Sequence, residues 1–143
     1  MEKQLNNFLA DLVVEYHKLQ NFHWYVKGKD FFTVHAKLEE LYNGINNAID
    51  EVAENILMIE GKPLASLKDF LEHASIKESK MEHIQSKEVF KEVLADFNYL
   101  LTSVKEIKKE ADEKEIYIIS ALMDEYIKQF TKSIWMISQV VCD

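Results

Sequence analysis

The sequence predicts an all-α domain built as a bundle of four long helices, and three observations lead to that fold class. Apolar residues recur at three- and four-residue steps through most of the chain, which is the pattern of amphipathic helices. The 143 residues include only 3 Gly and 1 Pro, too few for the many tight turns of a β-sandwich or barrel. The length suits a single domain, which we expect to span residues 1–143.

The first half of the chain contains the apolar stripes of two long helices. One stripe begins at Leu5 and predicts a helix over about residues 4–27, which Gly28 can end because glycine tolerates a positive φ. Asp30 or Thr33 can cap a second helix that runs to about residue 60. The sequence Gly-Lys-Pro at 61–63 then stops it, because proline cannot continue a helix.

The second half begins with a long connection and ends with two more helices. Periodicity weakens over 63–86, where Ser66 and Asp69 predict the cap of one short helix that runs through residue 73. A third long helix is expected over about 87–111. Asp112 and Glu115 look like a capping box for the fourth, whose apolar stripe continues through residue 137. Four such helices with one long crossover suit a four-helix bundle.

Charge and cysteine content narrow the functional classes. The formal net charge is −8, from 25 acidic and 17 basic residues, which disfavours a surface built to bind nucleic acid. We expect no membrane span, because no run reaches ~18 apolar residues, and the polar N-terminus does not resemble a secretory signal. The expected location is therefore cytoplasmic. Cys142 is the only cysteine and is expected to be a reduced, incidental thiol.

Five residues in the first two helices form a candidate metal site. Imidazole and carboxylate donors together suit iron, manganese or zinc. At ~100° per residue, the four members within the second helix fall inside ~100° of one another, on the side away from its apolar stripe. The candidate ligands are His23, His35, Glu39, Asp50 and Glu54.

Helix geometry shows that one chain cannot bring all five residues to one metal ion. Asp50 lies ~22 Å from His35 along the helix axis. Two copies of the second helix, packed antiparallel about a two-fold axis, would instead set His35 and Glu39 of one chain opposite Asp50 and Glu54 of the other. The internal two-metal site of other helical bundles needs Glu-x-x-His pairs, and this chain contains none.

Simpler interpretations of the same residues remain open at this point. His23 continues an apolar stripe and can be a satisfied core histidine. Asp50 and Glu54 can be a solvated like-charge pair, which slightly destabilises a helix. Glu39 can be an ordinary surface carboxylate.

Five segments of the chain carry a resemblance to a known family. They are Asn-Phe-His-Trp-Tyr-Val-Lys-Gly at 21–28, Phe-Phe-Thr-Val-His at 31–35, Glu-Glu-Leu-Tyr at 39–42, Ile-Asp-Glu-Val-Ala-Glu at 49–54, and Lys-Ser-Ile-Trp-Met at 132–136. The chain resembles the Dps family, the ferritin-like mini-ferritins of prokaryotes. The resemblance is dense from residue 21 to about residue 61 and recurs at 132–136.

The resemblance implies a ferritin-like four-helix bundle with a ferroxidase centre between two subunits. His23 and His35 are implied to come from one subunit, and Asp50 and Glu54 from its two-fold partner. Glu39 stands where the family often has Asp, so it binds the metal directly or through water. Trp24 resembles a family tryptophan thought to intercept oxidising equivalents, and it can also simply be a large hydrophobe at the dimer contact.

The implied activity is oxidation of Fe(II), preferentially by hydrogen peroxide, and storage of Fe(III) mineral in a hollow dodecamer that protects against oxidative stress. Family members that bind DNA directly often have a flexible Lys/Arg-rich tail. This sequence departs from that pattern, with only Met-Glu-Lys before the first helix, so we expect no direct DNA binding. Asp112, Asp124 and Glu125 are candidates for an iron pore, although surface carboxylates are the simpler interpretation. The alternatives are a nucleoid-protecting or surface-binding shell with little ferroxidase activity, and a helical interaction module whose acidic stripe meets a basic partner.

Overall fold

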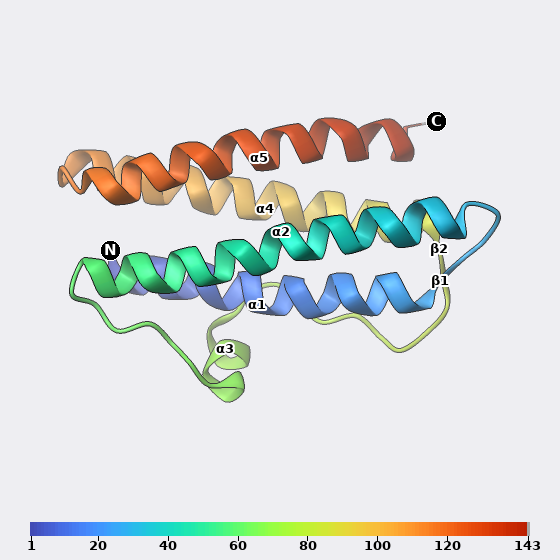
Figure 1. Cartoon of the computed structure of the whole chain (residues 1–143), viewed down its shortest axis with the longest axis horizontal. Coiled ribbons are helices and arrows are strands. Elements are labelled where there is room, and N and C mark those ends of the chain that lie inside the picture. The colour runs from blue at the N-terminus through green and yellow to red at the C-terminus, as the bar shows by residue number, and fades with distance from the viewer. Residues whose placement is uncertain (143) are drawn as a thin grey trace.

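The computed structural model describes residues 1–142 and confirms the all-α bundle (Figure 1). The long helices are α1 (Glu2–Tyr25), α2 (Phe31–Met58), α4 (Ser86–Glu113) and α5 (Tyr117–Val141). The pairs α1–α2 and α4–α5 each form an antiparallel hairpin, and the two hairpins pack face to face. Within residues 1–142, no helix combines the length and the apolar composition needed to cross a membrane.

The bundle core is formed by the predicted apolar stripes of all four long helices. Phe97 of α4 packs edge-on against Phe130 of α5, with ring centroids 5.3 Å apart. Tyr126 of α5 is buried beside Phe8, and its hydroxyl donates to a carboxylate oxygen of Glu51 at 3.0 Å. Burial of these aromatic residues, together with the aliphatic residues of the core, is the main stabilising contribution to the fold.

A long crossover connects α2 to α4 and contains the predicted short helix, α3 (Leu67–His73). The Ser66 hydroxyl accepts from the backbone N–H of Asp69 at 3.2 Å, which confirms the predicted cap. No residue of α3 is buried. The crossover has to be long because α2 and α4 run in the same direction, so the chain must return along the whole bundle (Figure 1).

Polar side chains on α1 hold the crossover in place. Asn6 donates to the carbonyl of Lys62 and accepts from the N–H of Leu64, both at 2.9 Å. The carboxylate of Asp11 accepts from two consecutive amides, at residues 75 and 76. Asn21 donates to two carbonyls, at residues 79 and 80. These bonds satisfy crossover backbone groups that no helix or long strand satisfies.

The sequence did not predict a short parallel pairing beside the bundle. Strand β1 (Val26–Lys27) follows α1 and pairs with β2 (Ile84–Gln85), which precedes α4. The first helix therefore ends at Tyr25 rather than 27. Gly28 has a φ of 140°, as its predicted role requires, but it turns the chain after β1 instead of ending the helix.

The predicted capping box at the start of the last helix is wrong. Helix α4 continues to Glu113, and α5 begins at Tyr117 with no side-chain cap. The turn between them is closed by backbone bonds, with Glu115 at a φ of 57°. Asp112 instead accepts from the Ser120 hydroxyl and pairs with Lys108, so it caps no backbone N–H of α5.

Candidate metal centre

Two of the predicted ligands, His23 and His35, form a stacked pair. His23 lies in the last turn of α1 and His35 in the second turn of α2, and the short connection between these helices brings the two turns together. Their ring centroids are 3.6 Å apart, with 12° between the ring planes. His23 is buried and His35 is half-buried.

Reciprocal hydrogen bonds fix the tautomer of both rings. Nδ1 of His23 lies 2.7 Å from the carbonyl oxygen of His35, and Nδ1 of His35 lies 2.8 Å from the carbonyl oxygen of His23. A carbonyl oxygen only accepts, so each Nδ1 is the donor. In a neutral ring with its proton on Nδ1, Nε2 keeps its lone pair and can bind a metal ion. Metal-binding histidines commonly have this arrangement, in which the other ring nitrogen donates to a carbonyl or carboxylate oxygen.

Two aromatic residues that sequence reasoning did not assign hold this pair. Phe31 stacks on His35 with ring centroids 4.8 Å apart, and Tyr42 meets His23 edge-on at 5.3 Å. The signal was present in the sequence, because Phe31 lies four residues before His35 and Tyr42 lies seven residues after it, both on its side of the helix. Rotation of either imidazole is therefore restricted.

Glu39 joins the histidine pair. Its Oε1 lies 3.9 Å from Nε2 of His23 and accepts a weak hydrogen bond from the Tyr42 hydroxyl at 3.4 Å. Partial burial and the negative charge of Glu39 raise the pKa of the Tyr42 hydroxyl. The structure thus sets one carboxylate beside one of the two imidazoles at this end of α2, and the three groups are not close enough to hold a metal ion together.

Asp50 and Glu54 lie elsewhere on the same exposed side of α2 and do not reach the histidines within one chain. A hydrogen bond that the protonated Glu54 carboxyl donates to Asp50, together with the negative charge of Asp50, raises the pKa of Glu54. A negative charge so close to Glu54 disfavours its ionised form. Among residues 1–142, no three His, Cys, Asp or Glu side chains are close enough to hold a metal ion. The predicted ligands therefore divide into a histidine half, with His23, His35 and Glu39, and a carboxylate half, with Asp50 and Glu54.

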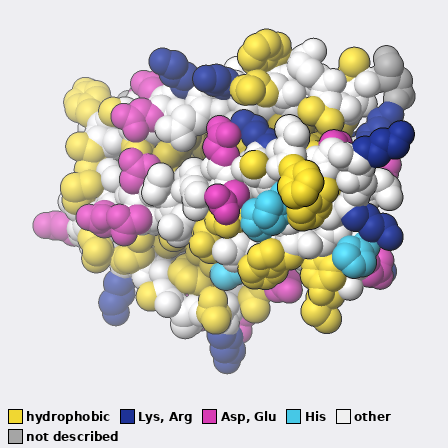
Figure 2. Space-filling view, turned by 45° about the vertical axis from the view of Figure 1, so that its right-hand side comes forward, with side chains coloured by type: hydrophobic (Ala, Val, Ile, Leu, Met, Phe, Trp, Pro, Cys, Tyr) yellow, Lys and Arg dark blue, Asp and Glu magenta, His cyan; other side chains and the backbone are white. Residues whose placement is uncertain are grey.

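The surroundings of the histidine half are apolar and open. Trp24, adjacent to His23 in sequence, is 63% exposed, and Phe32 is 85% exposed. Figure 2 shows histidine side chains among hydrophobic side chains on this face, with carboxylates beside them. Large exposed hydrophobes that surround polar groups are typical of a contact surface.

The candidate pore residues are engaged in ion pairs in the single chain. Lys108 lies 3.0 Å from Asp124 and 3.6 Å from Asp112, and its Nζ donates to Ser120 at 2.8 Å. One lysine therefore offsets part of the charge of these two carboxylates, and all three candidate pore residues are exposed. This agrees with the simpler interpretation of Asp112 and Asp124 as surface carboxylates.

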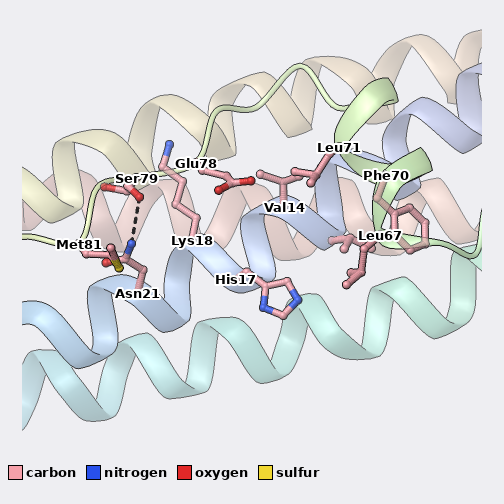
Figure 3. Close-up of a pocket in the computed structure, with 11 residues that line it drawn as sticks. Val14, His17, Lys18, Asn21, Leu67, Phe70, Leu71, Glu78, Ser79 and Met81 are labelled. Atoms are coloured by element: carbon pink, nitrogen blue, oxygen red, sulfur yellow. Dashed lines mark hydrogen bonds between the residues drawn. The ribbon is translucent and has the colours of Figure 1, made fainter.

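A pocket of about 410 Å³ lies between α1, α3 and the crossover (Figure 3). Its wall is largely apolar, with Val14 and Phe70 facing each other across it, and its charged groups are of both signs, Lys18 and Glu78. Asn21 is bonded to the Ser79 carbonyl at its edge. This mixture offers no set of metal ligands, so the histidine face remains the candidate site.

Comparison with known proteins identifies the domain and its relatives. Residues 2–143 match the model of the ferritin-like domain. The DNA protection during starvation protein of Helicobacter pylori is 35% identical over 133 residues, covering 93% of this chain and 92% of that protein.

Solved structures of similar proteins have the same fold. The crystal structure of antigen TpF1 from Treponema pallidum superposes with a TM-score of 0.97 at 30% identity, over 99% of this chain and 90% of that one. A DPS protein from Vibrio cholerae O1, described as a member of a broad superfamily of ferritin-like diiron-carboxylate proteins, gives 0.94 at 35% identity, over 97% and 87%.

Proposed function

Because the chain belongs to the Dps family of ferritin-like proteins, we propose that it oxidises Fe(II) at sites shared between two subunits and stores the Fe(III) product as a mineral. The observation that carries the proposal is the reciprocal bonding of His23 and His35, which leaves both Nε2 lone pairs free. This arrangement leaves both Nε2 atoms available as metal donors.

The donor set fits iron. Neutral imidazoles retain Fe(II), and carboxylates favour the harder Fe(III) that oxidation produces. Glu39 is 56% exposed beside His23, so its side chain can bind the ion directly or through water. A cation bound near Asp50 and Glu54 would also remove the charge repulsion that raises the pKa of Glu54.

Completion of the site requires a second copy of the chain. His35 and Asp50 are separated by ~22 Å along α2, so a two-fold axis across α2 is needed to set the histidine half of one chain against the carboxylate half of the other. The same operation creates two equivalent sites per dimer. We also propose that these dimers assemble further into a hollow dodecamer.

Hydrogen peroxide is the proposed oxidant. One hydrogen peroxide molecule takes up two protons and accepts one electron from each of two Fe(II) ions. The products are two Fe(III) ions and two water molecules, and no hydroxyl radical is released. The chain's own contribution is to hold its Fe(II) substrate with fixed imidazoles, since Phe31 and Tyr42 restrict both rings. Trp24, exposed next to His23, is the proposed site for interception of stray oxidising equivalents.

Stress protection would then follow from removal of iron and peroxide rather than from coating of DNA. A net charge of −8 disfavours contact with phosphates, so we expect no mobility shift of DNA at ordinary salt between pH 6 and 8. A stable shift would favour the alternative of a nucleoid-binding shell. A cytoplasmic location stays a prediction.

The test is to add Fe(II) and then peroxide to the purified protein and to follow Fe(III) formation optically. We expect fast oxidation by the wild type and a loss of at least about tenfold in His23→Ala/His35→Ala, because both imidazole donors are gone. The matched control is His17→Ala/His73→Ala, which removes two exposed histidines outside the site. Oxidation no faster than in buffer, or equal loss in the control, would contradict the proposal.

A further inference from the structure

Residues 75–80 of the crossover, here called the clasp, lie over a row of polar side chains on α1. At ~100° per residue, Asp11, Glu15 and Lys18 fall within about 60° of one another on this helix. Asp11 accepts from two amides near the start of the clasp, and Asn21 donates to two carbonyls at its end (Figure 3). These two anchor points are ~15 Å apart along α1, so the clasp crosses the height of Glu15 and Lys18.

The clasp also covers the seam between α1 and α4. Lys18 of α1 shares the wall of one pocket with Glu78 and Ser79 of the clasp. Glu92 of α4 shares the wall of a second pocket with the clasp and the crossover residues that follow it. Side chains of α1 and α4 that meet in this seam are therefore kept from water by the clasp.

Glu15 is completely buried in this seam although it is an acidic residue. Among residues 1–142, no group donates a hydrogen bond to either of its carboxyl oxygens. Its hydrogen-bonding neighbour is Asp96 of α4, which is a second carboxyl group. Two carboxyl groups can bond to each other only when one of them holds a proton. The arrangement therefore requires one proton between Glu15 and Asp96.

Lys18 decides which of the two carboxyl groups holds that proton. Its Nζ lies 2.8 Å from Oδ2 of Asp96, and the two side chains are 7% and 15% exposed. A cation at this distance favours the ionised form of Asp96, so the proton belongs to Glu15. In agreement, burial and next the charge of Asp96 raise the pKa of the Glu15 carboxyl well above its ordinary value.

Loss of this proton would leave two buried carboxylates beside one ammonium group. The helices offer little compensation, because they present three carboxyl groups and a single ammonium group to Glu15. The charged residues around it are Asp11 and Lys18 on α1, Glu92 and Asp96 on α4, and the exposed Lys77 and Glu78 on the clasp. A buried ion without a partner of its own is strongly disfavoured, so an ionised Glu15 gains free energy when water reaches it.

We infer that Glu15, Asp96 and Lys18 form a pH-dependent switch, which keeps the clasp closed while Glu15 holds its proton and loosens it when that proton is lost. The closed structure favours the neutral carboxyl. Closure is therefore complete below the unfolded pKa of about 4.3 and weakens as pH rises towards the raised pKa of Glu15. The inference does not depend on the proposed iron chemistry.

The clasp connects this switch to the end of α1. It leads into β2, which pairs with β1 directly after the last turn of α1. Nδ1 of His83, just before β2, donates to the carbonyl oxygen of Tyr25 at 3.0 Å. The pH would thus regulate how firmly the crossover holds the turn of α1 that contains His23.

Hydrogen exchange of the iron-free protein, followed by mass spectrometry at pH 6 and pH 9, tests the switch. After correction for the intrinsic exchange rates, protection of the clasp peptides should fall at least about tenfold, because opening that releases one proton changes by up to tenfold per pH unit. Peptides from α5 should keep their protection. Glu15→Gln cannot ionise and should stay protected at pH 9, whereas the matched control Glu78→Gln should behave as wild type.

Infrared titration provides a second test that does not depend on opening. The band of a protonated carboxyl group should persist at neutral pH and be missing in Glu15→Gln. Asp96→Asn frees Lys18 to pair with Glu15, so the band should disappear at lower pH than in wild type. Lys18→Met removes the cation but keeps an apolar stem, so the band should disappear at higher pH.

Equal protection of the clasp at both pH values, or loss of protection at pH 9 that remains in Glu15→Gln, would overturn the inferred switch. Loss of protection that α5 shares would also overturn it, because that result indicates general unfolding. Midpoints that Asp96→Asn and Lys18→Met shift in the same direction would exclude the assigned roles of the two groups. These assays contain no iron, so failure of the ferroxidase test would leave the switch standing.

Discussion

Two inactive variants of this protein should restore each other's activity when their chains are mixed. The first, His23→Ala/His35→Ala, lacks the histidine half of the site and keeps the carboxylates. The second, Asp50→Asn/Glu54→Gln, lacks the carboxylate half and keeps the histidines. Alone, each variant assembles only incomplete sites, so each should oxidise Fe(II) at close to the background rate.

The two-fold arrangement sets the size of the recovery. Equal amounts of the two chains, paired at random, give about one half mixed dimers. Each mixed dimer has one site with both halves intact and one site with both halves removed. About one quarter of all sites should therefore be complete, and the mixture should oxidise iron at about one quarter of the wild-type rate.

The assay requires chains that exchange. The two variants are unfolded together in urea, refolded, and compared at equal total protein with wild type treated in the same way. A mixture of the separately refolded variants is the control and should stay inactive. Activity that stays at background after co-refolding, while sedimentation shows mixed assemblies, would refute the shared site, because a site within one chain cannot be restored by this exchange.

Three further predictions concern groups around the bundle. Burial, and next the charge of Asp96, raise the pKa of the Glu15 carboxyl well above its ordinary value. The contribution of this carboxyl to stability is therefore complete below the unfolded pKa of about 4.3 and declines as pH rises. In calorimetry, Glu15→Gln should raise the melting temperature by about 3 °C or more at pH 8 and hardly at pH 4. Asp11→Ala leaves the amides of residues 75–76 without their acceptor and should speed their hydrogen exchange at least about tenfold, by NMR. Tyr42→Phe keeps the ring against its histidine and should hold the initial oxidation rate within about threefold, whereas Tyr42→Ala should lower it about tenfold or more.

The sequence was informative where the cause of structure is local. Apolar residues at helical spacing predicted all four long helices, because burial of one stripe is what stabilises an amphipathic helix. The cap formed by Ser66 was also predictable, since its partner lies three residues away. The β1–β2 pairing was not, because residues 26–27 and 84–85 meet only after the crossover has returned along the bundle.

The failed capping box shows how other contacts of a side chain override a sequence motif. Asp112 has the right residue type and spacing for a cap, but Lys108 and Ser120 engage its carboxylate in the folded chain. The turn is then closed by backbone hydrogen bonds around Glu115. The spacing of the motif contains no information about these competing partners.

The candidate site was predictable in part. Residue spacing indicated that His35 and Glu39 lie far from Asp50 on one face of α2, and the structure agrees with that separation. The stacking of the two histidines and their exchange of Nδ1 bonds depend on how α1 packs against α2, which helix periodicity does not contain. Tyr42 was missed because an aromatic residue near a helix core is most simply interpreted as packing.

A crystal structure of the protein soaked anaerobically with Fe(II), with anomalous scattering at the iron edge to locate the metal, tests the shared site most directly. We expect two equivalent metal peaks per dimer, each between His23 and His35 of one chain and Glu54 of the partner subunit, with Asp50 of the partner subunit beside it. Iron held entirely within one chain, or a two-fold contact that leaves the carboxylates away from the histidines, would contradict it.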